Sequence, residues 1–266
     1  MAHKSVGGLP RSGRPGPAAA GVDPRAPRGP REPRAARATR GSAAPRATSA
    51  AAGAYARVRD LIVRGRLPPG ARLTEAEVTS RLAISRTPAR EALRRLQQEG
   101  LLVAGGGGRG AQTRLLVAPM TREDVEELYH LAGALEGLAA RRVGLLAHAE
   151  RRALGAALRE AEAAFRAEAH RSPLDFDRLF ERHDAFHRTL VTACAGPRTR
   201  ALLDTIRPQL DRYEWYYAPL IGPDFRPTYA EHAAIIRAVI AGEADAAEQA
   251  VRANWWNGAE RLAGKI

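Results

Sequence analysis

Residues 82–96 constrain the fold of this chain more than any other segment, because they combine a helix start with a helical apolar stripe and a row of arginines. Ser85 is a typical helix N-cap residue, since its hydroxyl can accept from a free backbone N–H. Pro88 follows in the first turn, where its missing N–H costs little. Apolar residues then recur at helical spacing and can face a core: Ala89, Leu93 and Leu96. The pattern predicts the turn and second helix of a helix-turn-helix.

The polar side chains of this helix lie off the apolar stripe, and they are Arg86, Thr87, Arg90 and Arg94. Arg90 and Arg94 are one turn apart and share a face. Arginine can bond the O6 and N7 atoms of guanine or bind phosphates, and threonine suits a phosphate or a thymine methyl group. These four residues are therefore predicted DNA contacts.

The flanking residues complete a winged helix-turn-helix. A helical stripe begins near Tyr55, and Thr74 precedes Glu77 by three residues, which is capping-box spacing for a helix over 74–82. Gly100 can end the arginine-rich helix in a left-handed conformation. Two short strands are expected at 101–103 and 113–117, around a glycine-rich tip followed by Arg109 and Gly110, which we assign as wing contacts to DNA.

Charge and composition divide the chain into three parts. The 266 residues carry a net charge of +13, of which residues 1–50 hold +8, residues 51–115 hold +7 and the remainder holds −2. A basic N-terminal half on a near-neutral remainder is typical of a DNA-binding module joined to a sensing or dimerising module. Residues 1–50 are rich in Ala, Arg, Pro and Gly without aromatics, so we predict a disordered basic tail there. The DNA-binding domain is expected over 51–118 and a second domain over 119–266.

The cysteine content and the hydropathy of the sequence indicate the cellular compartment in which the protein is expected. Cys194 is the only cysteine, so neither an intrachain disulfide nor a cysteine-based metal site is expected, as in a reducing cytosol. The sequence has no apolar run long enough for a membrane span and no secretory signal at its N-terminus. These features predict a cytoplasmic protein without a membrane partner.

After residue 119 nearly every segment has a helical pattern. Thr121 is the expected N-cap of the first helix, and breaks contain proline or glycine. The six expected helices cover roughly 121–147, 149–170, 174–194, 198–217, 228–241 and 243–263. The predicted fold is therefore mostly α, with an N-terminal winged helix-turn-helix and a C-terminal all-α six-helix bundle.

Polar groups on apolar faces of this bundle predict a metal site. His183 and His187 share a face with Leu179, Phe180, Leu190 and Cys194, and His232 and Asn254 lie on apolar stripes of later helices. A buried imidazole is costly unless it is bonded. A divalent metal, Zn²⁺ first and Mn²⁺ or Ni²⁺ as alternatives, would satisfy these groups. The alternatives are hydrogen-bonded core histidines, or a site in which Asp184 supplies a carboxylate.

The sequence does not favour an enzyme. The His183-to-His187 spacing is that of a zinc-protease helix, but Asp184 stands where that motif has its glutamate base. Nucleotide-binding and serine-nucleophile motifs are missing from the sequence. A metal-dependent hydrolase would not need the arginine-bearing helix, and a constitutive architectural DNA binder would not need the polar groups in the bundle.

Several segments together resemble the GntR family of bacterial transcription regulators, in its FadR-like branch with an FCD effector domain. The resemblance covers about residues 54–264. It depends on the segments GRLPPGARL (65–73), SRTPAREALRRL (85–96), EGLL (99–102), RGA (109–111) and LEGLAA (135–140), and on the pairs Phe186-His187 and Glu231-His232. Ala76 and Ala83 depart from the arginine and glycine that the family often has at these positions.

The resemblance implies a homodimer that binds a palindromic operator in double-stranded DNA, most often as a repressor, under control of a small metabolite. It assigns DNA contacts to Arg86, Thr87, Arg90 and Gly110. It also places a metal site at His183, His187, His232 and Asn254, where His183 replaces the usual aspartate and Asn254 the usual final histidine. An organic acid is the implied class of effector, although the arginine that the family usually has near Ala132 is absent.

Overall fold

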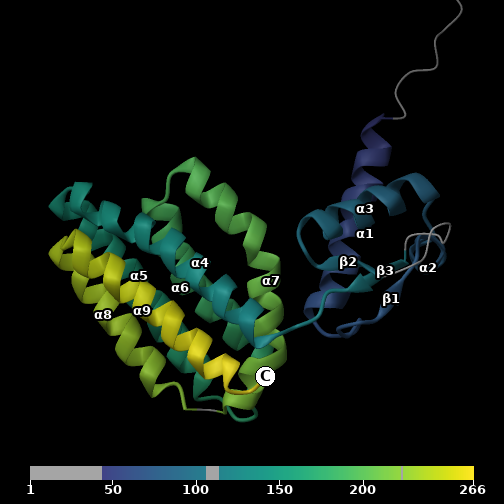
Figure 1. Ribbon diagram of the computed structural model, residues 1–266. Helices are drawn as coiled ribbons and strands as arrows, with labels where there is room; N and C mark the ends of the chain where they lie inside the picture. The colour runs from purple at the N-terminus through teal and green to yellow at the C-terminus, as the bar shows by residue number, and fades with distance from the viewer. Residues whose placement is uncertain (1–43, 106–113, 223) are drawn as a thin grey trace, which may run out of the picture. The chain divides into compact units, whose positions relative to one another are not determined.

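The structure, a computed structural model, describes residues 44–105, 114–222 and 224–266. Figure 1 shows the N-terminal winged helix-turn-helix and the C-terminal helical domain. The predicted disordered tail falls on residues 1–50, of which 1–43 lie outside the described residues. The predicted domain boundary at 118–119 stays a prediction, since residues 42–266 group as one compact unit.

The N-terminal domain has the predicted winged helix-turn-helix topology. Its elements are α1 (Ala44–Val63), β1 (Arg72–Leu73), α2 (Glu75–Leu82), α3 (Arg86–Gln98), β2 (Leu102–Gly105) and β3 (Arg114–Val117). The strands form an antiparallel sheet in the order β1-β3-β2. The two wing strands were predicted, whereas the two-residue strand β1, which pairs with β3, was missed.

The first helix begins earlier than predicted. The sequence indicated order from about Tyr55 and a boundary at residue 50, but α1 starts at Ala44. Alanine is the best helix former, and the alanines between positions 44 and 54 extend the helix at little cost in backbone entropy. Composition alone misled here, because a segment poor in large apolar residues can still continue a helix that is anchored further along by Val58 and Ile62.

The turn between α2 and α3 depends on local backbone chemistry. Thr74 and Glu77 form the predicted capping box, with the Glu77 backbone N–H donating to Thr74 Oγ1 over 3.2 Å. Ala83 adopts a left-handed conformation with φ of +52°, as its place in the turn required at some cost for a non-glycine residue. Ser85 is the N-cap residue of α3, but its side chain makes no capping hydrogen bond, so that part of the prediction was wrong. Gly100, with φ of +73°, follows the end of α3 as predicted.

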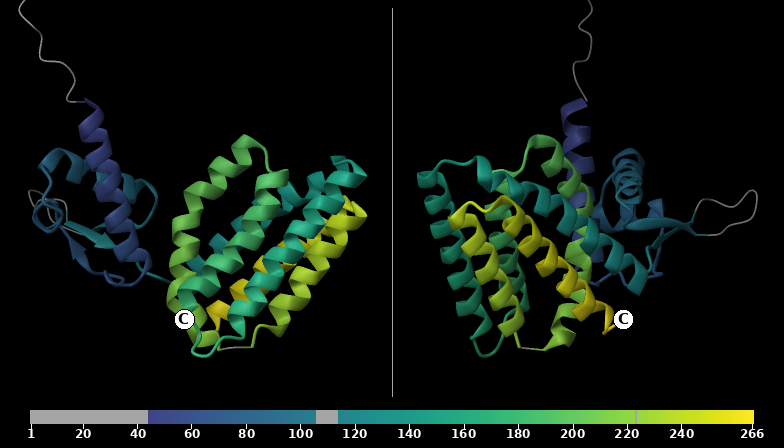
Figure 2. Two further views of the ribbon diagram at one scale, coloured as in Figure 1. Left: turned by 180° about the vertical axis from the view of Figure 1, so that it is seen from behind. Right: turned by 60° about the vertical axis from the view of Figure 1, so that its left-hand side comes forward.

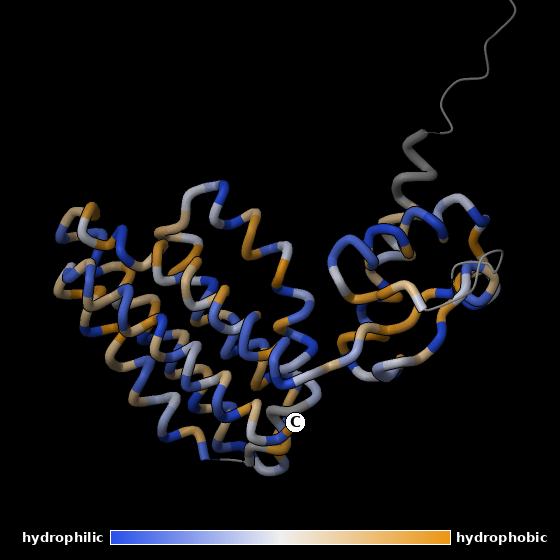
Figure 3. The backbone as a smooth tube through the Cα atoms, viewed as in Figure 1, coloured by the Kyte–Doolittle hydropathy of each residue, from blue (hydrophilic) through white to orange (hydrophobic). Residues whose placement is uncertain are grey.

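The C-terminal domain contains the six predicted helices within its described residues. They are α4 (Arg122–Arg141), α5 (His148–Ala169), α6 (Phe176–Cys194), α7 (Pro197–Ile221), α8 (Arg226–Ala241) and α9 (Ala244–Ala263), with a short 3₁₀ helix, η1 (Arg142–Leu145), after α4. Thr121 caps α4 as predicted, accepting from the Asp124 N–H. Figure 3 shows hydrophobic and hydrophilic residues alternating along these helices, as amphipathic helices around a core require. The end of α7 was placed too early, because Pro219 lies inside the helix.

Helices α4 and α9 pack along each other for most of their length, as Figures 1 and 2 show. Two glycines allow this close approach. A Cβ added at Gly133 would lie 3.0 Å from Cβ of Trp255, and one added at Gly137 would lie 3.0 Å from Cγ of Arg252. The distance between the two helices therefore depends on the absence of side chains at these two positions.

The hydrophobic core of the helical domain draws on all six helices, with fully buried side chains that include Val125, Leu158, Phe186, Leu210, Ile235 and Val251. In the described part of the chain, none of the helices has a stretch long and apolar enough to cross a membrane.

Candidate DNA-reading helix and metal centre

Helix α3 buries one face and exposes its arginines. Pro88, Ala89, Ala92, Leu93 and Leu96 are buried in the N-terminal core. The four predicted DNA contacts Arg86, Thr87, Arg90 and Arg94 are all exposed. The other two predicted contacts, Arg109 and Gly110, lie outside the described residues. Three of the predicted DNA contacts are arginines, and their guanidinium groups lie on the exposed side of α3 rather than in the N-terminal core.

One of these arginines has a partner that sequence reasoning missed. Arg90 donates from Nε and Nη2 to the two carboxylate oxygens of Glu75 on α2, at 2.7 and 3.0 Å. The hydrogen bonds from Arg90 lower the pKa of Glu75. An exposed pair of this kind contributes little to stability. Its effect is to hold the Arg90 guanidinium in a defined orientation on the exposed side of α3.

Three of the predicted metal ligands come together in the helical domain. His183 and His187 lie on α6 and His232 lies on α8. Each offers a ring nitrogen, and the three nitrogens lie within 4.8 Å of one another. His187 and His232 are 2% and 0% exposed, and His183 is partly buried.

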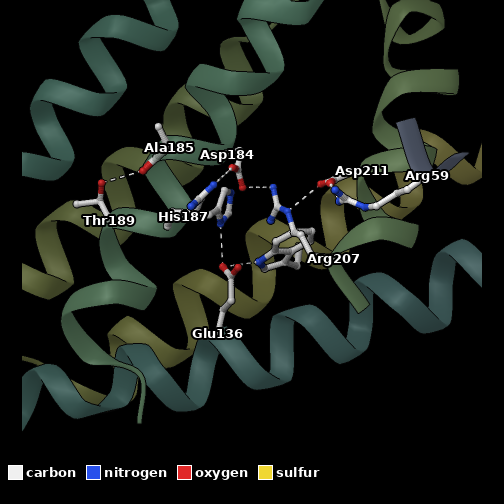
Figure 4. Close-up of polar contacts among 10 residues, drawn as sticks. Arg59, Glu136, Asp184, Ala185, His187, Thr189, Arg207 and Asp211 are labelled. Atoms are coloured by element: carbon white, nitrogen blue, oxygen red, sulfur yellow. Dashed lines mark hydrogen bonds and ion pairs between the residues drawn. The ribbon is translucent and has the colours of Figure 1, made fainter. Parts of the chain in front are cut away.

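A carboxylate orients the ring of His187. Nδ1 of His187 donates to Glu136 on α4 over 2.8 Å, as Figure 4 shows, and Trp255 Nε1 donates to the same Glu136 oxygen over 2.9 Å. Burial alone would raise the pKa of Glu136, but the attraction of His187 and the two hydrogen bonds outweigh it and lower the pKa. Glu136 therefore stays ionised and fixes which nitrogen of His187 carries a proton.

The ring of His232 is held in the same way from another helix. Its Nδ1 donates to Glu162 on α5 over 2.5 Å. In both His187 and His232 the remaining nitrogen, Nε2, is buried without a hydrogen-bond partner among the described residues. A histidine that ligates a metal normally donates its other ring N–H to a carboxylate, which is the arrangement seen twice here.

The pKa shifts of His183 and His232 also favour metal binding. Burial lowers the pKa of His183 well below its usual value. Burial also lowers the pKa of His232, and it outweighs the hydrogen bond to Glu162, which acts in the opposite direction. Neutral rings carry a free lone pair, and a divalent ion bound by imidazole nitrogens needs such lone pairs. The imidazole cluster, defined as His183, His187 and His232, therefore has the donor atoms that suit Zn²⁺.

Asn254 lies near the cluster, whereas Asp184 does not belong to it. Asn254 is 5% exposed and donates from its amide nitrogen to Glu231 over 2.8 Å, which leaves the amide oxygen as the group that could face an ion. Asp184 forms ion pairs with Arg207 and Arg188 instead. These ion pairs, and the place of Asp184 outside the imidazole cluster, argue against the alternative in which Asp184 supplies the missing carboxylate.

A cavity of about 100 Å³ adjoins the imidazole cluster. Residues from six helices line it, among them His183, His187, Asn254, Glu214 and Trp255. Tyr213 and Trp215, two aromatic residues of α7, do not line this cavity. Tyr213 instead donates to Asp124 over 2.7 Å, and Trp215 packs against Phe180.

The carboxylates around the cluster escaped sequence reasoning. Glu136 and Glu162 lie on the apolar stripes of their helices, where an acid needs a partner. An acidic residue on an apolar stripe is the one sequence feature that could have indicated a functional role for Glu136 and Glu162.

Comparison with known proteins agrees with this architecture. Residues 50–110 match the model of bacterial regulatory proteins of the gntR family, and residues 127–255 match the FCD domain. An uncharacterised HTH-type transcriptional regulator of Agrobacterium vitis is 34% identical over 144 residues, covering 54% of this chain and 79% of that protein. A D-xylose utilization operon transcriptional repressor of Paenarthrobacter nicotinovorans is 39% identical over 93 residues, which cover 32% of this chain and 37% of that protein.

Among solved structures, a GntR transcriptional regulator from a Rhodococcus species superimposes with a TM-score of 0.62 at 22% identity, covering 82% of this chain and 99% of the other. That similarity extends across both domains of the fold. Taken with the two family matches and the exposed arginines of α3, it identifies the chain as a DNA-binding transcriptional regulator rather than an enzyme, a member of the GntR family with an FCD effector-binding domain.

Proposed function

We propose that this regulator is a homodimeric cytoplasmic repressor whose operator affinity depends on a metal and a small metabolite in the helical domain. The observation that carries the proposal is the pair of buried Nε2 atoms, on His187 and His232, that have no partner among the described residues while carboxylates hold the opposite nitrogens. His183 completes the imidazole cluster, and Asn254 supplies an amide oxygen beside it.

Zn²⁺ is the metal that this donor set favours, because it accepts three imidazoles and leaves a position for an exogenous ligand. Mn²⁺ and Ni²⁺ are the alternatives. Two nitrogens bound to one tetrahedral zinc lie about 3.4 Å apart, so binding would draw the imidazole cluster together. When bound, the ion supplies a Lewis-acidic attachment point for a donor atom of the effector, while the cavity residues select the rest of the molecule.

The DNA-binding role is proposed for Arg86, Thr87, Arg90 and Arg94, with Arg109 and Gly110 on the wing. Their support is the exposure of the four α3 residues and the fit of arginine to guanine edges and phosphates. A palindromic operator follows from a two-fold dimer. The repressor role is supported by the relative from Paenarthrobacter nicotinovorans, which is named as a repressor.

An exposed apolar surface supports the dimer. Leu131 and Leu138 on α4 are 45% and 55% exposed at a spacing of seven residues, and Trp256 on the adjacent α9 is also exposed. A second copy would cover these side chains. Sedimentation analysis should find a dimer for the wild type and a monomer for Leu138→Glu, and a wild-type monomer at micromolar concentration would contradict the proposal.

The test of the whole proposal begins with protein purified without chelator, in which bound metal is measured by mass spectrometry. An operator is selected from random DNA, and its affinity is compared for metal-loaded protein, EDTA-treated protein and His187→Ala. We expect about one metal per chain, loss of that metal in the variant, and operator affinities that differ by about 5-fold or more between loaded and stripped protein. Absence of metal uptake, or equal affinities, would refute the metal-dependent part.

The same operator-binding assay tests the assignment of Arg86 and Arg90 as DNA contacts. Arg86→Ala combined with Arg90→Ala should abolish operator binding while metal content stays unchanged. Operator affinity that is unaffected by this double change would refute the assignment of α3 to DNA.

A further inference from the structure

The cavity beside the imidazole cluster has an aromatic lining and an excess of acidic groups. Five of its lining residues are aromatic: Tyr129, Phe165, Phe180, Phe225 and Trp255. Apart from histidines and tyrosine, its titratable lining residues are Glu214, Asp224 and Arg261. An aromatic lining of this kind suits an apolar group or an organic cation, because the faces of aromatic rings attract positive charge.

Among the described residues, the one cation of the lining, Arg261, is already neutralised. Arg261 donates from Nη1 and Nη2 to the two carboxylate oxygens of Glu231, at 2.8 and 3.0 Å. Asp224 is likewise bound, accepting from Nε and Nη2 of Arg226 at 2.8 and 2.7 Å. These two pairs leave Glu214 as the lining carboxylate without a direct ion pair among the described residues.

Glu214 is buried without a hydrogen-bond donor. It lies on α7, is 6% exposed, and receives no hydrogen bond from any described residue. Arg207, a cation that attracts the Glu214 carboxylate, forms ion pairs with Asp184 and Asp211, as Figure 4 shows. Burial raises the pKa of Glu214 to about 7, and the attraction of Arg207 opposes this only in part. Neither oxygen of Glu214 is among the fully enclosed atoms without a partner, so the carboxyl group is open to the cavity that it lines, where a ligand donor can reach it.

We propose that the cavity binds a small ligand with an ammonium group, which lies among the aromatic rings and pairs with Glu214 while the other end of the ligand reaches the imidazole cluster. The cavity volume of about 100 Å³ limits the ligand to a short molecule. The ligand class is therefore a short amine or ω-amino carboxylate. The assignment of a metal-bound end depends on the proposed function, whereas the ammonium subsite does not.

Charge balance distinguishes this class from a simple organic acid. An organic acid without an amine would place its apolar tail against Glu214, and the carboxyl group of Glu214 would remain without a partner. Arg261 could not bind the carboxylate of such a ligand freely, because it is already paired with Glu231. An ammonium donor satisfies Glu214 and gains cation–π stabilisation from the rings. The competing explanation is that Glu214 only balances the charge of a divalent ion, and this predicts no preference between ligands.

The test compares isosteric probes by calorimetry on the full-length protein. Zinc-loaded protein is titrated with 4-aminobutyrate and with pentanoate, which have the same number of non-hydrogen atoms and differ in the ammonium group. EDTA-treated protein is titrated with n-butylammonium and with 1-butanol. We expect the ammonium member of each pair to bind at least about tenfold more tightly. The metal-free arm is independent of the proposed metal site.

Glu214→Gln keeps the shape of the side chain and removes its charge. This variant should reduce the preference to within about twofold while zinc stoichiometry and thermal stability stay as in the wild type. Glu160→Gln, an exposed residue of α5, removes the same charge far from the lining and should keep the preference.

Each outcome has a definite meaning. Equal or tighter binding of pentanoate and 1-butanol, an unchanged preference in Glu214→Gln, or no binding of either amine overturns the inference. If zinc does not bind but n-butylammonium is still preferred, the metal proposal fails and the ammonium subsite stands.

Discussion

Replacing Glu136 by glutamine tests whether the buried carboxylate supports a metal ligand. One oxygen of Glu136 accepts from both His187 Nδ1 and Trp255 Nε1, at 2.8 and 2.9 Å. A glutamine oxygen can take the same place and accept from the same donors, so Glu136→Gln preserves the shape of the contact and removes its charge. The imidazole of His187 then becomes a weaker donor to a metal.

The expected loss of zinc affinity follows from the hydrogen bond between Glu136 and His187. Outer-shell partners of metal-bound histidines are generally worth 10- to 100-fold in metal affinity. Because Glu136 orients one of three imidazoles and the glutamine oxygen still accepts both hydrogen bonds, we expect the lower end, about tenfold or about 1.4 kcal/mol. Glu162→Gln should act similarly through His232, although Glu162 also pairs with Arg166.

Competition with a chromophoric zinc chelator at neutral pH measures the affinity of each variant. His187→Ala gives the value for a lost ligand, and Glu160→Gln gives the value for an equal charge change on the surface. If Glu136→Gln binds zinc as tightly as the wild type while His187→Ala does not, the carboxylate has no role in metal binding. If all four proteins bind equally, the ion does not use this histidine.

Three further predictions concern DNA binding, packing and the thiol. Arg90→Ala should weaken operator binding by about 1–3 kcal/mol in fluorescence anisotropy if the guanidinium bonds a base, and an unchanged affinity would exclude that contact. Gly155→Ala should lower the free energy of urea unfolding by about 1–2 kcal/mol, because its Cβ would overlap Ile240, whereas Gly53→Ala meets open space and should raise it by up to about 1 kcal/mol. Burial raises the pKa of Cys194 to about 11, so at pH 8 only about one thiol in a thousand is ionised, and iodoacetamide should label it only after unfolding.

The helices and the inward faces of the histidines were predictable, because both depend on short-range spacing. Two histidines four residues apart share a face, and His232 lies on an apolar stripe. That these histidines meet in one cluster was an implication of the family resemblance, because His232 lies on another helix. The start of α2 was equally local, since Thr74 and Glu77 form their capping box within four residues.

The partners of these residues were beyond sequence reasoning for a common physical reason. Glu136 and Glu162 are 51 and 70 residues away in sequence from the histidines that they hold, and periodicity places a residue on a face without stating which helix that face meets. The pair between Glu75 and Arg90 spans the helix-turn-helix in the same way. The pairing of Asp184 with Arg207 was equally hidden, because Arg207 comes from another helix.

The glycines at the contact of α4 and α9 bear on ligand choice. Trp255 forms part of the cavity lining, and Gly133 lies directly against it without lining the cavity itself. A methyl group at position 133 would crowd Trp255, whose indole packs against the ring of His187 at a centroid distance of 4.9 Å, and would therefore change the space beside the imidazole cluster. In such a regulator, a substitution behind a lining residue can change which ligands fit. The substituted position would not appear among the residues that contact the ligand.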